Sequence, residues 1–186
     1  MSYLRTFLPW IVYSVVPSSH WQWGALAGLL VAVAVVAQQL RAGRTPDALI
    51  IEIGSAVFFA VITVVAFTSP DSPAHPYSPA ISAASLALIA GVSLAIGRPF
   101  TLGIAKQSVP REYWGQPLFV RSNVVITSVW TGAFAASAVV LGMIVHAGGA
   151  GSPIAIAAQV AGFVVPMLFT IRCAAAVRAK APNAAR

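Results

Sequence analysis

The side chain in this sequence that is best placed to do chemistry inside a membrane is Glu52, in the apolar segment ALIIEIGSAVFF. An ionisable residue in a membrane span costs at least about 2.5 kcal/mol to insert, so it indicates a candidate site for a proton or a substrate. Glu52 also lies about one turn from the expected start of its helix, where the helix dipole stabilises a carboxylate and a cytoplasmic arginine can pair with it. The sequence favours this structural pairing and leaves a small transporter that uses Glu52 as the alternative.

Three histidines and one aspartate are the other candidates for metal chemistry, because imidazole and carboxylate groups are the usual ligands of zinc. They are His20, His75, His146 and Asp71. No two histidines are spaced as an i, i+4 pair or as HxH, and the three are scattered over different loops. We therefore predict no metal site.

The sequence contains no recognisable catalytic constellation. Only four residues are acidic, no serine lies in a nucleophile-elbow context, no phosphate-binding loop occurs, and no carboxylates are paired. The net charge of +7 comes from cations spread along the chain, without a nucleic-acid recognition motif or an aromatic ladder. Cys173 is the single cysteine, which excludes an internal disulfide. We expect a non-enzymatic protein that uses no cofactor and binds no nucleic acid.

The composition is that of an integral membrane protein. Of the 186 residues, 59% are hydrophobic and 8% are charged, whereas soluble domains carry about 25% charged residues. Each span needs about 20 apolar residues, and the apolar segments must be helices because an unpaired backbone amide in lipid costs several kcal/mol. We predict an all-α integral membrane protein, a bundle of five to six transmembrane helices in one domain, residues 1–186. The spans cover approximately residues 6–20, 23–40, 48–68, 81–97, 124–147 and 154–171.

The first of these spans is the least regular. Its apolar run from Thr6 to Val16 has 11 residues and lies between Arg5 and Pro17. It is therefore either a short or tilted span or a re-entrant segment. A signal peptide is disfavoured, since no small-residue cleavage site follows it.

The distribution of charge predicts the orientation of the chain. The connections PSSHWQW, SPDSPAHPYSP and GGAGSP contain no lysine or arginine, and all 11 cations fall on the opposite side or at its interface. Cytoplasmic loops retain lysine and arginine, so both termini are expected in the bacterial cytoplasm and the spans in the inner (plasma) membrane. Residues 178–186 form a basic tail that is expected to be disordered.

The longest polar stretch, residues 98–123, is expected to be a cytoplasmic loop on the membrane surface. A helix from Phe100 to Val109 would have one apolar side and one side with Lys106, which is the pattern of an interfacial amphipathic helix. The segment PREYWG is expected to form one helical turn. Cations near the surface attract anionic headgroups by about 1 kcal/mol each, although the loop could also be a simple connector. The predicted contacts with anionic lipid or a partner are Arg98, Lys106, Arg111, Trp114 and Arg121.

Small residues within the spans are expected to form packing faces. Gly24 and Gly28 make a GxxxG step, which lets two helices approach closely. A second stripe of small residues recurs every four positions in the fourth span and could also receive a partner protein. This stripe is Ala83, Ala87, Gly91 and Ala95.

The chain resembles the bacterial intracellular septation protein A family over residues 4–172. The likeness lies in FLPW near the N-terminus, in the order of the apolar segments and in the dipeptide RP after the fourth span. The likeness extends to Trp114, Asn123 and Trp130 around the start of the fifth span. Asn123 is, in addition to Glu52, the second polar residue expected within the membrane. The resemblance implies a small multi-span inner-membrane protein with a role in envelope maintenance and division, without an assigned reaction.

Together these features predict a non-enzymatic, multi-pass inner-membrane protein that acts in cell-envelope maintenance or septation through lipid or partner contacts. Two alternatives remain. An accessory subunit of a lipid-transport or respiratory complex would be favoured by an exposed stripe of small residues. A small transporter would be favoured by a water-filled cavity that reaches Glu52.

Overall fold

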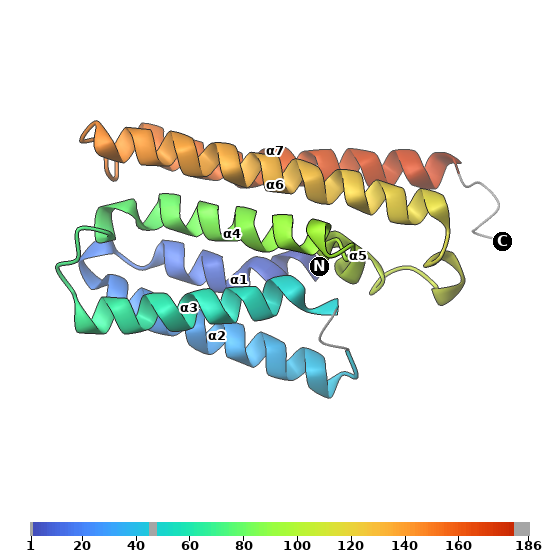
Figure 1. Cartoon of the computed structure of the whole chain (residues 1–186), viewed down its shortest axis with the longest axis horizontal. Helices are drawn as coiled ribbons and strands as arrows, with labels where there is room; N and C mark the ends of the chain where they lie inside the picture. Colours follow the sequence, from blue (N-terminus) through green and yellow to red (C-terminus); the bar gives the residue numbers. More distant parts are fainter. Residues whose placement is uncertain (1, 45–47, 181–186) are drawn as a thin grey trace. The chain divides into compact units, whose positions relative to one another are not determined.

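The computed structural model describes residues 2–44 and 48–180, with side chains for residues 5–44 and 48–177. These residues form seven α-helices and three short 3-10 turns, with no β-strand among them (Figure 1). The all-α prediction is confirmed, and five helical segments are long and apolar enough to cross a membrane. The chain divides into two compact units, Met1–Ser78 and Pro79–Arg186, which we call unit 1 and unit 2. The five segments are Ser18–Arg41, Ile50–Thr68, His75–Ala95, Pro117–His146 and Pro153–Val177.

Unit 1 is built from α1 (Ser2–Val15), α2 (Trp21–Arg41) and α3 (Ile50–Thr68), and α2 packs against both of the others. The turn η1 (Ser18–His20) leads directly into α2, so residues 6–20 are not one continuous helix. Proline disfavours the helical conformation in the residue before it, which explains why α1 ends ahead of Pro17. The helix α1 has 14 residues, whereas a straight membrane span needs about 20 residues.

Two glycines bring α2 close to its neighbours within unit 1. A Cβ atom at position 28 would lie 2.6 Å from Cε1 of Phe59, a fully buried ring on α3. A Cβ atom at position 24 would lie 3.1 Å from Cβ of Val16. Gly24 and Gly28 therefore form the close-packing step that their spacing predicts.

Unit 2 contains most of α4 (Ser78–Ala95), which follows the turn η3 (His75–Tyr77) of unit 1. The short helix α5 (Phe100–Ala105) and the turn η4 (Arg111–Tyr113) come next. The long helices α6 (Pro117–His146) and α7 (Pro153–Lys180) then run side by side (Figure 1).

Two boundaries in unit 2 differ from the prediction. The helix α6 begins at Pro117, so the last seven residues of the expected loop, 117–123, are helical. Proline suits the first turn of a helix, where its missing N–H would be unpaired in any case. At the other end, α7 continues to Lys180, so residues 178–180 are helical and not part of a disordered tail. Residues 181–186 lie outside the described residues.

Aromatic rings fill the core of unit 2. Trp130 and Phe134 of α6 are 2% and 1% exposed, and the ring centroid of Phe134 lies 5.3 Å from that of Phe163 on α7. The indole Nε1 of Trp130 donates a hydrogen bond of 3.0 Å to the hydroxyl of Thr170. This bond satisfies a polar group that would otherwise be costly to bury.

The predicted stripe on α4 is only partly a packing face. Ala83 is buried in a cluster with Leu141 and Ala155, and a Cβ atom at Gly91 would make an ordinary 3.6 Å contact with Thr131 of α6. At the end of the stripe, Ala95 is exposed.

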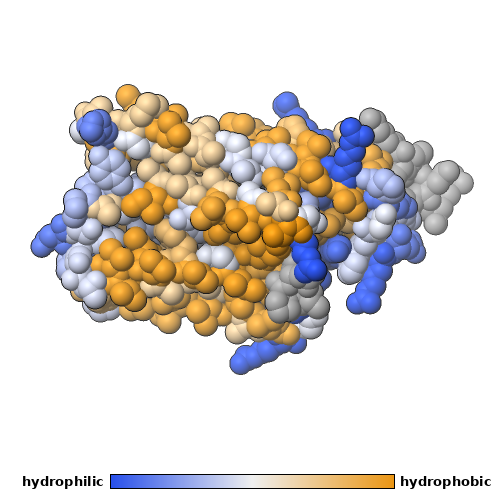
Figure 2. Space-filling model, in the orientation of Figure 1, coloured by the Kyte–Doolittle hydropathy of each residue, from blue (hydrophilic) through white to orange (hydrophobic). Residues whose placement is uncertain are grey.

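Large apolar side chains also cover the outer faces of the helices. Leu30, Leu88 and Ile154 are between 63% and 71% exposed. Figure 2 shows apolar residues over the middle of the helices and hydrophilic residues toward their ends. Since exposed apolar surface costs roughly 25 cal/mol per Å² in water, these faces fit a lipid environment.

Candidate functional site

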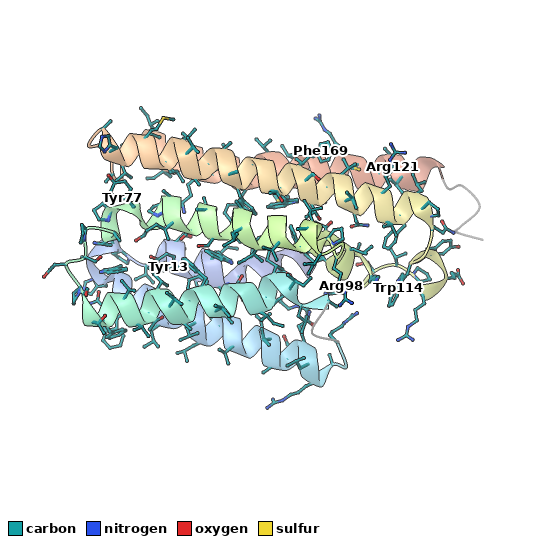
Figure 3. All side chains as sticks on the ribbon, in the orientation of Figure 1. Tyr13, Tyr77, Arg98, Trp114, Arg121 and Phe169 are labelled. Atoms are coloured by element: carbon teal, nitrogen blue, oxygen red, sulfur yellow. The ribbon has the colours of Figure 1, made fainter. Side chains whose placement is uncertain are left out.

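One end of unit 2 carries the predicted lipid contacts. Figure 3 shows Arg98 after the end of α4, Trp114 in the connection from α5 to α6, and Arg121 near the start of α6. The side chains of Arg98 and Arg121 are exposed, and that of Trp114 is half-buried.

Two cations of the same connection lie over the ring of Trp114. Its indole Nε1 donates a hydrogen bond of 2.9 Å to the carbonyl oxygen of Val109, which fixes the ring. Lys106 Nζ lies 5.1 Å from the ring centroid, and Arg111 Cζ lies 5.6 Å from it. Both distances fall within the range of about 6 Å over which a ring attracts a cation. We call Lys106, Arg111 and Trp114 the Trp114 cluster.

The turn η4 positions Arg111 beside the ring, and the prediction of one helical turn in PREYWG is confirmed. Pro110, with a φ of −55°, precedes the turn, as its fixed φ favours. Desolvation raises the pKa of the Tyr113 phenol, and the neighbouring carboxylate of Glu112 raises it further. The phenol of Tyr113 therefore stays neutral at physiological pH.

The helix α5 differs from the predicted interfacial helix. It ends at Ala105, and the side chains of Phe100, Thr101 and Ile104 are buried, with α6 as its packing neighbour. The expected apolar side consisted of Phe100, Leu102, Ala105 and Val109, of which Phe100 is buried and the other three are half-buried. The predicted extent to Val109 is therefore wrong, while the position of this segment at the membrane surface stays a prediction.

The buried side of α5 takes part in a network of hydroxyl groups that the apolar pattern does not reveal. Thr101 Oγ1 donates a hydrogen bond of 3.0 Å to the backbone carbonyl oxygen of Asn123 and lies 2.7 Å from Thr127 Oγ1. The backbone N–H of Phe100 donates to Ser93 Oγ at 3.1 Å. These bonds hold α5 to its neighbours in unit 2, since leaving such groups unpaired would cost about 1–3 kcal/mol each.

Asn123 is buried, as its position in an apolar segment suggests. It is 3% exposed, and its Nδ2 donates a hydrogen bond of 2.8 Å to the carbonyl oxygen of Phe119, one turn earlier in α6. The side chain thus bonds to its own helix, while its backbone carbonyl receives Thr101.

Glu52 is buried among the helices of unit 1. It lies in the first turn of α3, as predicted, and is 3% exposed. Thr6 Oγ1 donates a hydrogen bond of 2.8 Å to Glu52 Oε1, and the Arg5 guanidinium attracts the carboxylate. The positive partner therefore comes from α1, at the start of the chain. Within the described part of the chain, Glu52 Oε2 has no hydrogen-bond partner.

Two of the histidines interact with an aromatic ring or a hydroxyl group. The ring of His75 stacks on Trp21 at a centroid distance of 4.7 Å, and His20 Nδ1 lies 2.9 Å from Ser19 Oγ. Among residues 2–44 and 48–180, no group of three His, Cys, Asp or Glu side chains could hold a metal ion.

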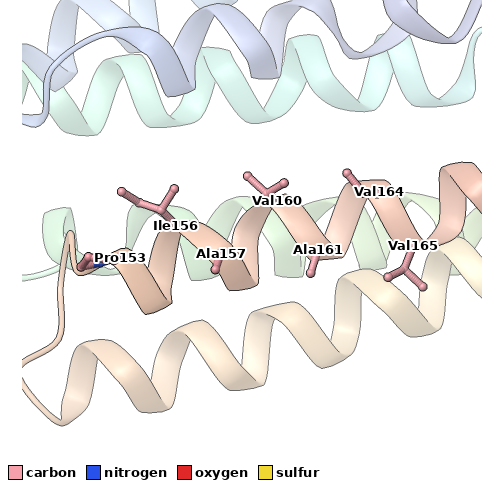
Figure 4. Close-up of a pocket in the computed structure, with 7 residues that line it drawn as sticks. All are labelled: Pro153, Ile156, Ala157, Val160, Ala161, Val164 and Val165. Atoms are coloured by element: carbon pink, nitrogen blue, oxygen red, sulfur yellow. The ribbon is translucent and has the colours of Figure 1, made fainter.

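An open apolar groove of about 560 Å³ runs along α7 (Figure 4). Its lining contains no ionisable or hydrogen-bonding side chain, so it offers no group for chemistry. The lining residues are Pro153, Ile156, Ala157, Val160, Ala161, Val164 and Val165.

The Trp114 cluster is thus the part of the predicted site that the structure brings together. It offers two positive charges beside a tethered indole ring, an arrangement suited to binding an anion at a membrane surface. The chain matches no protein-family model, no curated protein and no solved structure. The resemblance to the septation protein A family therefore rests on the sequence motifs alone.

Proposed function

We propose that this protein is a non-enzymatic, multi-pass protein of the bacterial inner membrane that acts in envelope maintenance or septation by contacting anionic lipid. The observation that carries the proposal is the Trp114 cluster, in which Lys106 and Arg111 lie 5.1 and 5.6 Å from one indole ring. The same connection also carries the carboxylate of Glu112, which interacts with the phenol of Tyr113.

The physical basis is the surface potential of the cytoplasmic leaflet. A lysine or arginine near an anionic surface gains about 1 kcal/mol, so two cations gain about 2 kcal/mol, or roughly 30-fold in affinity. Tryptophan favours the headgroup level, where its ring is in an apolar setting and its N–H is satisfied. In Trp114 the N–H is already bonded to Val109, so the ring can stay at that level while both cations reach phosphate.

The distribution of charge along the chain supports placing the Trp114 cluster at the cytoplasmic leaflet. All 11 cations fall on one side in a six-span arrangement, or at its interface, and the connection with Trp114 belongs to that side. The inner leaflet is also where anionic lipids attract basic segments.

The test is the lipid that purifies with the protein from native membranes. We expect the double variant Lys106→Gln, Arg111→Gln to retain less anionic lipid than the parent protein. The matched control is Arg41→Gln, Arg172→Gln, which removes the same charge from two exposed positions outside the cluster. Equal anionic lipid in the parent and the cluster variant would contradict the proposal, and an equal loss in both variants would show a general effect of charge.

A further inference from the structure

Trp23 differs from the other tryptophans of the chain in how its indole N–H is used. The chain has five tryptophans, and the structure describes all of them. Four donate the N–H to a protein oxygen, on Ser55, Pro70, Val109 and Thr170. Within the described part of the chain, the N–H of Trp23 has no such acceptor, and the side chain is 55% exposed. An acceptor for this N–H therefore comes from the surroundings of the protein.

A second exposed ring of unit 1 lies against Trp23. Phe67 on α3 is 45% exposed, and its ring centroid lies 5.4 Å from that of Trp23, with the two ring planes at 87°. Aromatic rings favour this edge-to-face arrangement. We call Trp23 and Phe67 the Trp23–Phe67 pair. The pair joins the start of α2 to the end of α3 and presents an apolar surface with one open hydrogen-bond donor.

The position of Trp23 along α2 places this pair at the depth of a membrane interface. The last turn of α2 carries the exposed Arg41, and Trp23 precedes Arg41 by 18 positions. At a rise of 1.5 Å per residue this separation is roughly 27 Å, close to the about 30 Å of a hydrocarbon core. If Arg41 lies at one headgroup level, Trp23 lies at the other. Tryptophan favours that level because its ring is apolar and its N–H is polar.

The surface that continues from the pair toward the middle of the two helices is apolar and exposed. Leu30 lies seven positions after Trp23, on the same face of α2, and is 63% exposed. On α3, Val64 precedes Phe67 by one turn and is also 63% exposed, and Val61 is 60% exposed. Such a continuous apolar surface below an amphipathic ring fits the acyl chains and the ester region of one lipid layer.

Charge limits which part of a lipid the pair can recognise. The sequence has no lysine or arginine between Val16 and Trp23 or between Phe67 and Ser82, and Asp71 is the one acidic residue there. This end of unit 1 therefore lacks the cations that would attract an anionic headgroup. An uncharged acceptor, such as the ester carbonyl oxygen of a phospholipid, suits the indole N–H better.

We propose that the Trp23–Phe67 pair is a second lipid-binding site, which takes the glycerol–ester region of a phospholipid without selecting the charge of its headgroup. The indole N–H donates a hydrogen bond to an ester carbonyl oxygen, and the two rings contact the first methylene groups of an acyl chain. The proposal shares only the membrane setting with the proposed function, because it uses neither Lys106 nor Arg111.

The test is nuclear magnetic resonance of the full, perdeuterated chain in nanodiscs of protonated phosphatidylcholine. The indole N–H signal of Trp23 is assigned by its loss in Trp23→Phe. We expect nuclear Overhauser cross-peaks from this N–H to the glycerol protons and to the methylene group beside the ester carbonyl. Cross-peaks to water alone or to the terminal methyl groups alone would overturn the proposal. The absence of any lipid cross-peak would also overturn it and would indicate a protein partner.

A matched control is Leu30→Trp, which places an indole on the same face of α2 but roughly 10 Å deeper. We expect its N–H to show cross-peaks to methylene groups of the middle of the acyl chains and none to glycerol. The same set of cross-peaks at positions 23 and 30 would contradict the depth assigned to the pair.

The lack of charge selection is tested by replacing part of the phosphatidylcholine with deuterated phosphatidylglycerol. We expect the cross-peaks of Trp23 to weaken only in proportion to the phosphatidylcholine that is removed. A larger loss would show a preference for the anionic lipid and would contradict the proposal, whatever the result for the Trp114 cluster.

Discussion

The hydroxyl oxygens of Thr101 and Thr127 lie 2.7 Å apart and join the short helix α5 to the long helix α6. Both side chains are fully buried. This bond, with the one from Thr101 to the carbonyl of Asn123, fixes the start of the segment that leads to Trp114. The residues that attach this segment are thus distinct from the cations proposed to contact lipid.

Replacing Thr101 by valine should therefore destabilise the protein while keeping the shape of the side chain. We expect a loss of about 1–3 kcal/mol in the free energy of unfolding, because Thr127 and the Asn123 carbonyl lose a buried partner. Thermal unfolding in detergent measures this. Thr68→Val is the control, since Thr68 is exposed and bonds only to its own helix. Equal stability of the two variants would contradict the assigned role.

The close approach of α2 and α3 predicts that Gly28→Ala is harmful. The added Cβ would lie 2.6 Å from the buried ring of Phe59, and such overpacking typically costs about 1–3 kcal/mol. Gly132→Ala in α6 is the control, because nothing lies within 4 Å of its Cβ position. There, alanine should be neutral or stabilise the helix by up to about 1 kcal/mol. A Gly28→Ala protein that unfolds at the same temperature as the parent would show that the two helices are less closely packed.

The orientation can be measured with cysteine labelling after Cys173→Ser removes the native thiol. We expect Ser72→Cys to react with a membrane-impermeant reagent in intact cells and Ser108→Cys to react only after lysis. The reason is that Ser72 lies in a connection without lysine or arginine, whereas Ser108 lies among the cations. The opposite labelling pattern would place the Trp114 cluster on the wrong side for the proposed lipid contact.

The apolar segments could be predicted from the sequence because their signal is strong. All five long spans coincide with helices, since about 20 apolar residues without charge leave few other structures open to them. The exact ends of the helices were harder to predict from the sequence. Pro117 starts α6 within the polar stretch, and α7 continues into the basic residues to Lys180, because neither proline at a first turn nor single cations stop a helix.

The candidate site was only partly predictable for a related reason. Cations and tryptophan are rare in this chain, so Lys106, Arg111 and Trp114 were visible in the sequence. Thr101 was not, because one threonine in a helical segment has no periodic signal that reports burial. Only the three-dimensional arrangement reveals that Thr101 bonds across to α6. The partner of Glu52 was likewise hidden, since Thr6 is 46 positions away.

Binding of anionic lipid by the Trp114 cluster is best measured on protein reconstituted in nanodiscs whose phosphatidylglycerol content is increased against phosphatidylcholine. Native mass spectrometry then counts the phosphatidylglycerol molecules that each protein retains. We predict that Lys106→Gln, Arg111→Gln needs up to roughly 30-fold more phosphatidylglycerol for equal retention, from about 1 kcal/mol per cation, while Arg41→Gln, Arg172→Gln, which leaves the Trp114 cluster intact, needs a smaller increase. Identical retention curves for the parent and the cluster variant would contradict the account.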